Sequence, residues 1–137
     1  MSELDPVTVL DASAVLALVK AEQGYEAVAA TLPGALLSTV NLAEVLTKLC
    51  DDGWPADEAD QAIASLGIVT VEFTAGQSLA AATLRENTRS AGLSLGDRAC
   101  LALGKQHHAR VLTTDAIWLN IAERVGIAIV NARLSAN

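Results

Sequence analysis

Four acidic residues stand where strands and helices are expected to meet. Asp11 directly follows a short apolar run at residues 7–10, and Asp115 lies just beyond a second such run at residues 111–113. Glu44 falls in the opening turns of an expected helix. Asp97 begins another helix, which is apolar almost all the way round and is therefore expected to be buried. Because ligands of open parallel sheets bind beyond the carboxyl ends of the strands, all four acids are expected at one edge of the fold.

Carboxylates gathered in this way point to metal-assisted hydrolysis. Like charges a few ångströms apart repel by several kcal/mol at an effective dielectric near 20, so such a cluster must be protonated or bind cations. Mg²⁺ and Mn²⁺ prefer carboxylate and water oxygens and need neither histidine nor cysteine. A bound ion of this kind lowers the pKa of water and neutralises the charge of an attacked phosphate.

Each acid taken alone has a simpler explanation. Asp11 and Asp115 could be helix N-caps, and Ser94 and Asp97 match the S-x-x-D pattern of a capping box. Glu44 could form an ordinary surface pair with the lysine four residues later. Capping alone does not explain why all four acids fall at the same ends of successive elements.

The elements that must position these acids alternate between strands and helices. Strands are expected at residues 7–10, 35–38, 68–73, 111–113 and 127–130. Helices are expected at residues 12–20, 25–32, 40–51, 55–65, 74–92, 97–108 and 118–125. This order predicts an α/β fold in which helices cover both faces of a central, mostly parallel sheet of four to five strands.

Length and composition are typical of one domain, here residues 1–137. Hydrophobic residues make up 52% of the chain, so a packed core is expected and disorder is not. The net charge of −7 argues against a broad nucleic-acid-binding surface, but divalent ions would reverse the sign of an acidic site locally.

The two cysteines indicate neither a disulfide nor a zinc site. Cys50 and Cys100 are both expected in buried helical stretches, and no apolar run is long enough to span a membrane. The first residues do not resemble a signal peptide. A cytoplasmic protein is therefore expected.

Four segments of the chain resemble the PIN-domain ribonucleases, and within them the VapC-type toxins of bacterial type II toxin–antitoxin systems. The segments read VLDASA at residues 9–14, NLAE at 41–44, LSLGDRACLAL at 93–103 and LTTDAIW at 112–118. They occur in the order typical of the family, and the similarity extends over residues 7–130. The third segment is the most specific.

The resemblance implies a fold, a site and partners. The fold would be a PIN-like three-layer α/β/α sandwich. Asp11 and Asp97 would be the principal Mg²⁺ ligands, with Mn²⁺ as an alternative ion, and Glu44 and Asp115 would complete the catalytic site directly or through water. The resemblance further implies an RNA substrate, a homodimer, and a cognate, VapB-like, DNA-binding antitoxin whose tail blocks the site. Polar positions that would support the acids are Ser13, Asn41 and Thr114.

Basic side chains on the expected helices are candidates for contacts with RNA phosphates. A solvated helix face is an equally good explanation for each of them. These candidates are Arg98, Lys48, Arg89 and Arg85. The pair His107–His108 is assigned a structural role at a helix C-terminus. Trp54 and Trp118 are assigned to packing or an interface.

Three other functions remain open. An aspartyl-phosphate phosphatase also places an Asp after the first strand, but its second Asp would stand where this chain has Ser13. A PIN nuclease could act in RNA processing without being a toxin. A catalytically idle module could use the same acids to bind a basic partner peptide.

Overall fold

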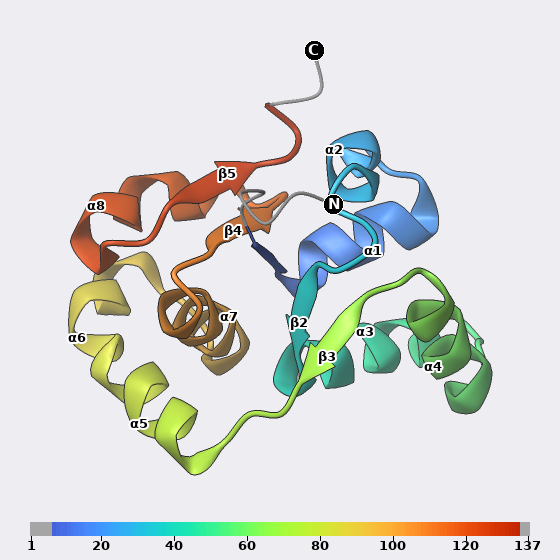
Figure 1. The fold of residues 1–137 in the computed structure, drawn as a ribbon, viewed down its shortest axis with the longest axis horizontal. Coiled ribbons are helices and arrows are strands. Elements are labelled where there is room, and N and C mark those ends of the chain that lie inside the picture. Colours follow the sequence, from blue (N-terminus) through green and yellow to red (C-terminus); the bar gives the residue numbers. More distant parts are fainter. Residues whose placement is uncertain (1–6, 135–137) are drawn as a thin grey trace.

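A parallel sheet of five strands forms the centre of the molecule. The structure is a computed structural model that describes residues 7–134, without the side chains of residues 117, 119 and 120. In spatial order the strands are β3 (Val69–Val71), β2 (Leu36–Ser38), β1 (Thr8–Leu10), β4 (Arg110–Thr113) and β5 (Ile129–Asn131). All four pairings are parallel, as the alternation of strands and helices predicted. Figure 1 shows β1 in the middle of the molecule.

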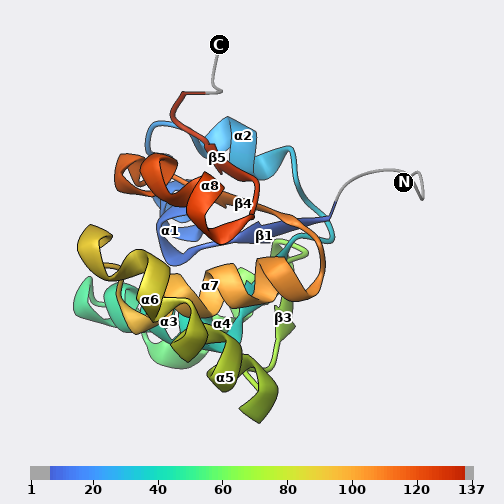
Figure 2. The same cartoon turned by 90° about the vertical axis from the view of Figure 1, so that its left-hand side faces the viewer.

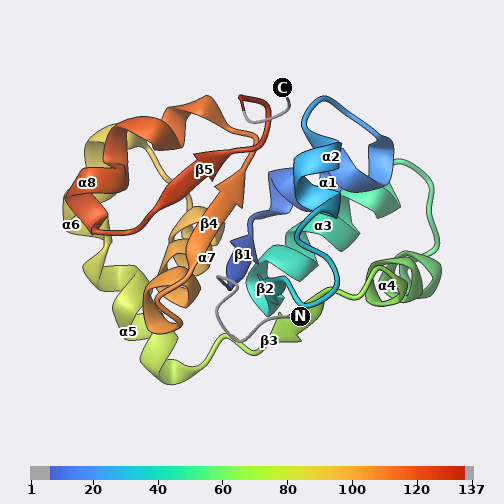
Figure 3. The same cartoon turned by 45° about the horizontal axis from the view of Figure 1, so that its top comes forward.

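Helices cover both faces of this sheet, which confirms the expected α/β/α layers. One face carries α1 (Ala12–Lys20), α2 (Tyr25–Ala29), α3 (Thr39–Asp51) and α4 (Ala56–Ser65). The other face carries α5 (Ala75–Thr83), α6 (Arg85–Thr88), η1 (Arg89–Ala91), α7 (Leu95–Gln106), η2 (Ala116–Ile121) and α8 (Ala122–Val125). Figure 3 shows the two groups of helices on opposite sides of the strands. In Figure 2, α7 runs below α8 and above α5.

The strands divide their side chains between two hydrophobic cores, because successive residues of a strand point to opposite faces. In β1, Val9 belongs to the core under α7, whereas Leu10 belongs to the core under α1 and α3. In β4, Val111 and Leu112 divide in the same way. This two-sided burial is what a short, continuous apolar strand indicates.

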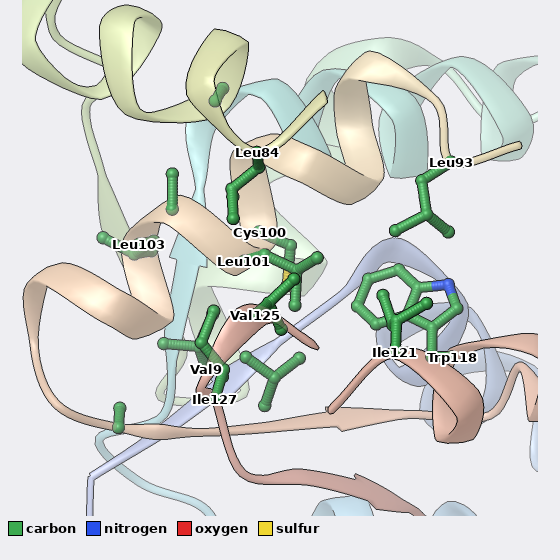
Figure 4. Close-up of a cluster of buried hydrophobic side chains, with 14 residues drawn as sticks. Val9, Leu84, Leu93, Cys100, Leu101, Leu103, Trp118, Ile121, Val125 and Ile127 are labelled. Atoms are coloured by element: carbon green, nitrogen blue, oxygen red, sulfur yellow. The ribbon is translucent and has the colours of Figure 1, made fainter. Parts of the chain in front are cut away.

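The helix α7 is the most deeply buried helix of the fold. Every residue from Ala99 to Gly104 is buried, as the apolar run in the sequence predicted. Figure 4 shows Leu101 and Leu103 of this helix in the core, with Trp118 beside Ile121. Trp118 is fully buried, so its predicted packing role is confirmed.

Several expected boundaries were wrong. The single helix expected at residues 74–92 is broken into α5, α6 and η1. The first break is at Leu84, between α5 and α6. At the second break, between α6 and η1, the hydroxyl of Thr88 donates to the carbonyl oxygen of Leu84 at 2.9 Å, a contact that bends helices, and Gly92 ends the segment with a left-handed φ of 69°. The last strand begins at Ile129 and not at residue 127, and the helix expected from residue 118 begins as the 3₁₀ turn η2.

The expectation for one of the two cysteines was also wrong. Cys100 is buried as predicted, but Cys50 is exposed because it lies on the outer side of α3. In the described part of the chain, no helix is long and apolar enough to cross a bilayer.

Truncating a core leucine of α7 should destabilise the protein far more than truncating a surface leucine. Leu101 is fully buried, whereas Leu79 on α5 is 72% exposed. We expect Leu101→Ala to lower the free energy of unfolding by about 2–5 kcal/mol, because a cavity is left behind. Leu79→Ala should change it by less than about 0.5 kcal/mol. Urea unfolding followed by circular dichroism measures both, and equal losses would contradict this assignment of the core.

Candidate active site

A pocket of about 560 Å³ opens at the carboxyl edge of the sheet, between α1, α3 and the start of α7. All four acids singled out in the sequence line it, together with Ser13 and two lysines. Its walls are formed by Asp11, Ala12, Ser13, Leu16, Lys20, Glu22, Glu44, Lys48, Asp97 and Asp115. The fold therefore brings together four carboxylates that are spread over more than a hundred residues of sequence.

Asp11 is the most enclosed of the four acids and is held by three donors. It is the N-cap of α1, and its Oδ1 accepts from the backbone N–H of Ala14 at 2.8 Å. The Ser13 hydroxyl lies 2.7 and 2.9 Å from the two carboxylate oxygens, and the Thr113 hydroxyl donates to Oδ2 at 2.6 Å. Only 4% of Asp11 is exposed. Its carboxylate is therefore fixed in orientation before any ligand binds.

Thr113 is a site residue that the sequence analysis missed. It is fully buried at the end of β4, where it bonds Asp11 and accepts from the backbone N–H of Asp115 at 3.0 Å. A hydroxyl at the carboxyl end of a strand, two residues before an acid, is the signal that could have identified it.

Burial raises the pKa of Asp11 from its ordinary 3.8 to about 6. Loss of solvation is the main cause, and the charge of Asp97 adds to it, while the hydrogen bonds from Thr113, Ala14 and Ser13 act in the opposite direction. The protein thus holds a carboxylate where negative charge is costly, which is the condition that a bound cation would relieve.

Asp97 forms a capping box with Ser94, as the simpler explanation for its position predicted. The backbone N–H of Ser94 donates to Asp97 Oδ2 at 2.9 Å, and the backbone N–H of Asp97 donates to the Ser94 hydroxyl at 3.2 Å. The same carboxylate lines the pocket. Capping and a place in the site are therefore not alternatives, because the cap is what fixes Asp97 at the start of α7.

Asn41 ties Glu44 to the start of α7. Its side-chain amide donates to Glu44 Oε1 at 2.8 Å and to the carbonyl oxygen of Gly96 at 3.0 Å. Asn41 is buried, and its Oδ1 has no hydrogen-bond partner within the described residues. A buried acceptor of this kind has the capacity to bind a water molecule.

The remaining predicted polar position, Thr114, contributes through its backbone. Its N–H donates to the Ser13 hydroxyl at 3.0 Å, and Thr114 lines a neighbouring pocket with Ala17 and Arg133. Thr114 therefore helps to fix Ser13, which in turn contacts Asp11.

Of the four basic residues proposed for RNA, Lys48 lines the pocket. Arg98 donates to the carbonyl oxygen of Ala81 on α5 at 3.0 Å, and the exposed Arg85 donates to that of Leu93, just before α7, at 3.4 Å. Arg89 is exposed on η1. The pocket's second lysine is Lys20, which was not predicted and pairs with Asp52 at 2.9 Å.

The two histidines lie at the opposite end of α7 from Asp97. His107 is the C-cap of this helix, and both His107 and His108 are exposed. This position agrees with the structural role assigned to them.

The acids line one pocket but do not form a preformed metal site. Within residues 7–134, no three acidic, histidine or cysteine side chains are close enough, as they stand, to hold an ion between them. Asp11, Asp97 and Glu44 each accept hydrogen bonds from their own neighbours. Mg²⁺ keeps several of its waters and is usually bound by one or two carboxylates. The carboxylates that line the pocket fit such a hydrated ion.

Comparison with protein families matches the PIN domain over residues 8–124. A toxin–antitoxin complex from Klebsiella pneumoniae is similar in structure, with a TM-score of 0.71, 16% identity, and coverage of 91% of this chain and 97% of the other. VapBC2 from Rickettsia felis, bound to a DNA fragment from its promoter, gives a TM-score of 0.67 and 16% identity over 91% and 98% of the two chains.

FitAcB from Neisseria gonorrhoeae is a third similar structure, with a TM-score of 0.64 and 21% identity over 92% and 98% of the two chains. No curated protein sequence matches this chain. At these identities the structural likeness establishes the shared fold.

The raised pKa of Asp11 should make stability depend on pH. Between pH 3.8 and about 6 the folded protein holds a proton on Asp11 that the unfolded chain has lost. The tighter proton binding of the folded state therefore stabilises the protein fully below pH 3.8, and this stabilisation disappears as the pH rises through 6. The difference between the two pKa values corresponds to roughly 3 kcal/mol. We expect the wild type to lose about this much stability relative to Asp11→Asn between pH 3.5 and 7.

Urea unfolding at several pH values, without divalent ions, measures this difference. Asp60→Asn on the exposed face of α4 is the matched control and should track the wild type. A constant difference between wild type and Asp11→Asn across the whole range would contradict the burial of an ionised Asp11.

Proposed function

The chain belongs to the PIN domain family, and on this premise we propose that it is a Mg²⁺-dependent endoribonuclease that hydrolyses RNA phosphodiester bonds. The observation that supports this most strongly is the single pocket lined by Asp11, Glu44, Asp97 and Asp115. Oxygen donors of this kind suit Mg²⁺ or Mn²⁺ and do not suit softer metals.

Asp11 and Asp97 are the proposed principal ligands, with Glu44 and Asp115 contributing directly or through water. When bound, the ion supplies activation of a water molecule and neutralisation of phosphate charge. The protein itself fixes the position and orientation of the carboxylates. Ser13 and Thr113 fix Asp11, the Ser94 cap fixes Asp97, and the burial of Asp11 keeps water away from its oxygens.

Lysines at the pocket are the proposed contacts for the RNA backbone. Lys48 stands one helical turn from Glu44 on α3, and Lys20 ends α1. Both line the same pocket as the acids, so a phosphate bound to them would lie beside the carboxylates. With a net charge of −7, the chain depends on such local positive charge, together with the bound ion, to attract an RNA strand.

We further propose that the nuclease is the toxin of a toxin–antitoxin pair. The toxin–antitoxin complex from Klebsiella pneumoniae supports this, because its matched chain shares the fold over 91% of this chain and 97% of its own length. The proposed partners are a DNA-binding antitoxin and a second copy of the chain. A small gene for a DNA-binding protein beside this one would favour the toxin, and its absence would favour a PIN nuclease of RNA processing.

One observation keeps a non-enzymatic function as a second candidate. No three acids are close enough to hold an ion as they stand in the described residues, and Asp97 already serves as a cap. An idle module could use the acidic pocket to dock a basic peptide. The next two experiments separate these functions.

Neutralising Asp97 should abolish RNA cleavage and leave the protein folded. An amide is a poor ligand for Mg²⁺, whereas the amide oxygen of Asn can still accept the hydrogen bond from the Ser94 backbone N–H. We expect Asp97→Asn to reduce cleavage of single-stranded RNA by a factor of about 10² or more, with a circular dichroism spectrum like that of the wild type. Asp60→Asn should cleave normally, because Asp60 is an exposed residue of α4. Full cleavage by folded Asp97→Asn would refute the assignment.

Calorimetric titration with Mn²⁺ tests the ion without reference to RNA. We expect binding to the wild type that is lost in Asp11→Asn and in Asp97→Asn, because each removes one negative oxygen ligand. Binding should weaken at pH 5 relative to pH 7.5, since protons compete for Asp11 as the pH falls below about 6. Absence of any binding that depends on these two residues would favour the idle module.

A further inference from the structure

The first turn of α7 contacts the Glu44 carboxylate directly. A Cβ placed on Gly96 would lie 2.4 Å from both carboxylate oxygens of Glu44 and 2.5 Å from its Cδ. Real Cβ atoms do not approach other atoms this closely. The Glu44 carboxylate therefore occupies the space that the side chain of any other residue at position 96 would need.

Asn41 also contacts this carboxylate and links it to the backbone of α7. Its amide nitrogen bridges Glu44 Oε1 and the carbonyl oxygen of Gly96, at 2.8 and 3.0 Å. Both partners are acceptors, so the amide must present its NH₂ group to them, and its orientation is fixed. Asn41 is only 1% exposed, which protects this bridge from competition by water.

The backbone of α7 does not itself require glycine at this position. Gly96 is the second residue of the helix, and helix propensity alone would favour alanine there. Gly76 occupies the equivalent second position of α5, also after a capping hydroxyl, and its Cβ would meet only Thr74 Oγ1 at 3.8 Å. The crowding around position 96 therefore comes from the Glu44 carboxylate across the α3–α7 contact, and a side chain there would have to displace it.

We propose that Gly96 and Asn41 together form a cradle that sets the position of the Glu44 carboxylate, and that Gly96 is a positioning residue of the acidic pocket. The importance of this position for catalysis rests on the proposed nuclease function, but the cradle itself does not. Glu44 reaches it from α3, while the adjacent residue of α7 is the proposed ligand Asp97. The cradle thus fixes two of the four acids relative to each other.

Gly96→Ala tests this proposal, with Gly76→Ala as the matched control. The carboxylate is the mobile end of a long side chain, so it can leave the cradle while the protein stays folded. The first measurement is the NMR signal pair of the Asn41 side-chain amide, which reports its hydrogen bond to Glu44. In Gly96→Ala the two signals should move toward their positions in Glu44→Ala, and in Gly76→Ala they should stay at the wild-type positions.

The second measurement is Mn²⁺ affinity by calorimetry. We expect Gly96→Ala to weaken binding about tenfold, the lower end of the effect of losing support for a ligand. Because Gly96 acts through Glu44, adding Gly96→Ala to Glu44→Ala should weaken binding no further. Glu44→Gln, made without any change at position 96, should shift the same Asn41 signals even if Gly96→Ala does not fold.

Unchanged Asn41 signals in folded Gly96→Ala, or in Glu44→Gln, would overturn the cradle. A full tenfold loss from Gly96→Ala in the Glu44→Ala background would overturn the claim that Gly96 acts through Glu44. If the Asn41 signals move as expected but the wild-type protein binds no Mn²⁺, the cradle stands and the proposed nuclease function fails.

Discussion

The burial of the Asp11 carboxylate at one edge of the sheet is the physical constraint on which the rest of the site depends. Asp11 is almost completely buried, and its pKa of about 6 shows that its own hydrogen bonds do not fully offset the loss of water. Asp97 adds to the unfavourable potential, and burial raises the pKa of the nearby Cys100 thiol, to which the charges of Asp11, Asp97 and Glu44 contribute. A fold selected only for stability has no need of such a pocket.

The sheet and the site share the same contacts. Leu10 of β1 pairs with Leu112 of β4, and the register continues to a hydrogen bond from the Asp11 N–H to the carbonyl oxygen of Leu112 at 3.2 Å. This pairing brings the Thr113 hydroxyl against the Asp11 carboxylate. A shift of the register by one residue would turn Thr113 to the other face of the sheet and remove the shortest hydrogen bond of the site.

Helix N-termini contribute to the electrostatics of the pocket. Asp11 caps α1, and Asp97 lies in the first turn of α7, so each acid sits at the positive end of a helix dipole. Such an end stabilises a nearby carboxylate by typically 0.3–1 kcal/mol, which is smaller than the roughly 3 kcal/mol implied by the raised pKa of Asp11. Helix capping explains where these acids stand, and the remaining electrostatic cost explains why a cation would be favoured there.

The sequence alone determined the alternation of strands and helices, the buried nature of α7, and the four acids beyond the strand ends. Apolar periodicity and capping residues are local signals, so they could be read without coordinates. It misjudged the segment at residues 74–92, where the Thr88 hydroxyl bends a helical pattern, and the exposure of Cys50. The Thr88 contact is local and was overlooked, whereas the exposure of Cys50 depends on which side of α3 packs against its neighbours.

Only the tertiary structure decided which distant residues contact each acid. Thr113 reaches Asp11 across 102 residues of sequence, and Asn41 reaches Gly96 across 55. The contact of Arg98 with α5, the place of Lys20 at the pocket and the closeness of Gly96 to Glu44 likewise follow from packing between elements. Such contacts depend on distances between segments that are far apart in the chain, and no local pattern of residues encodes those distances.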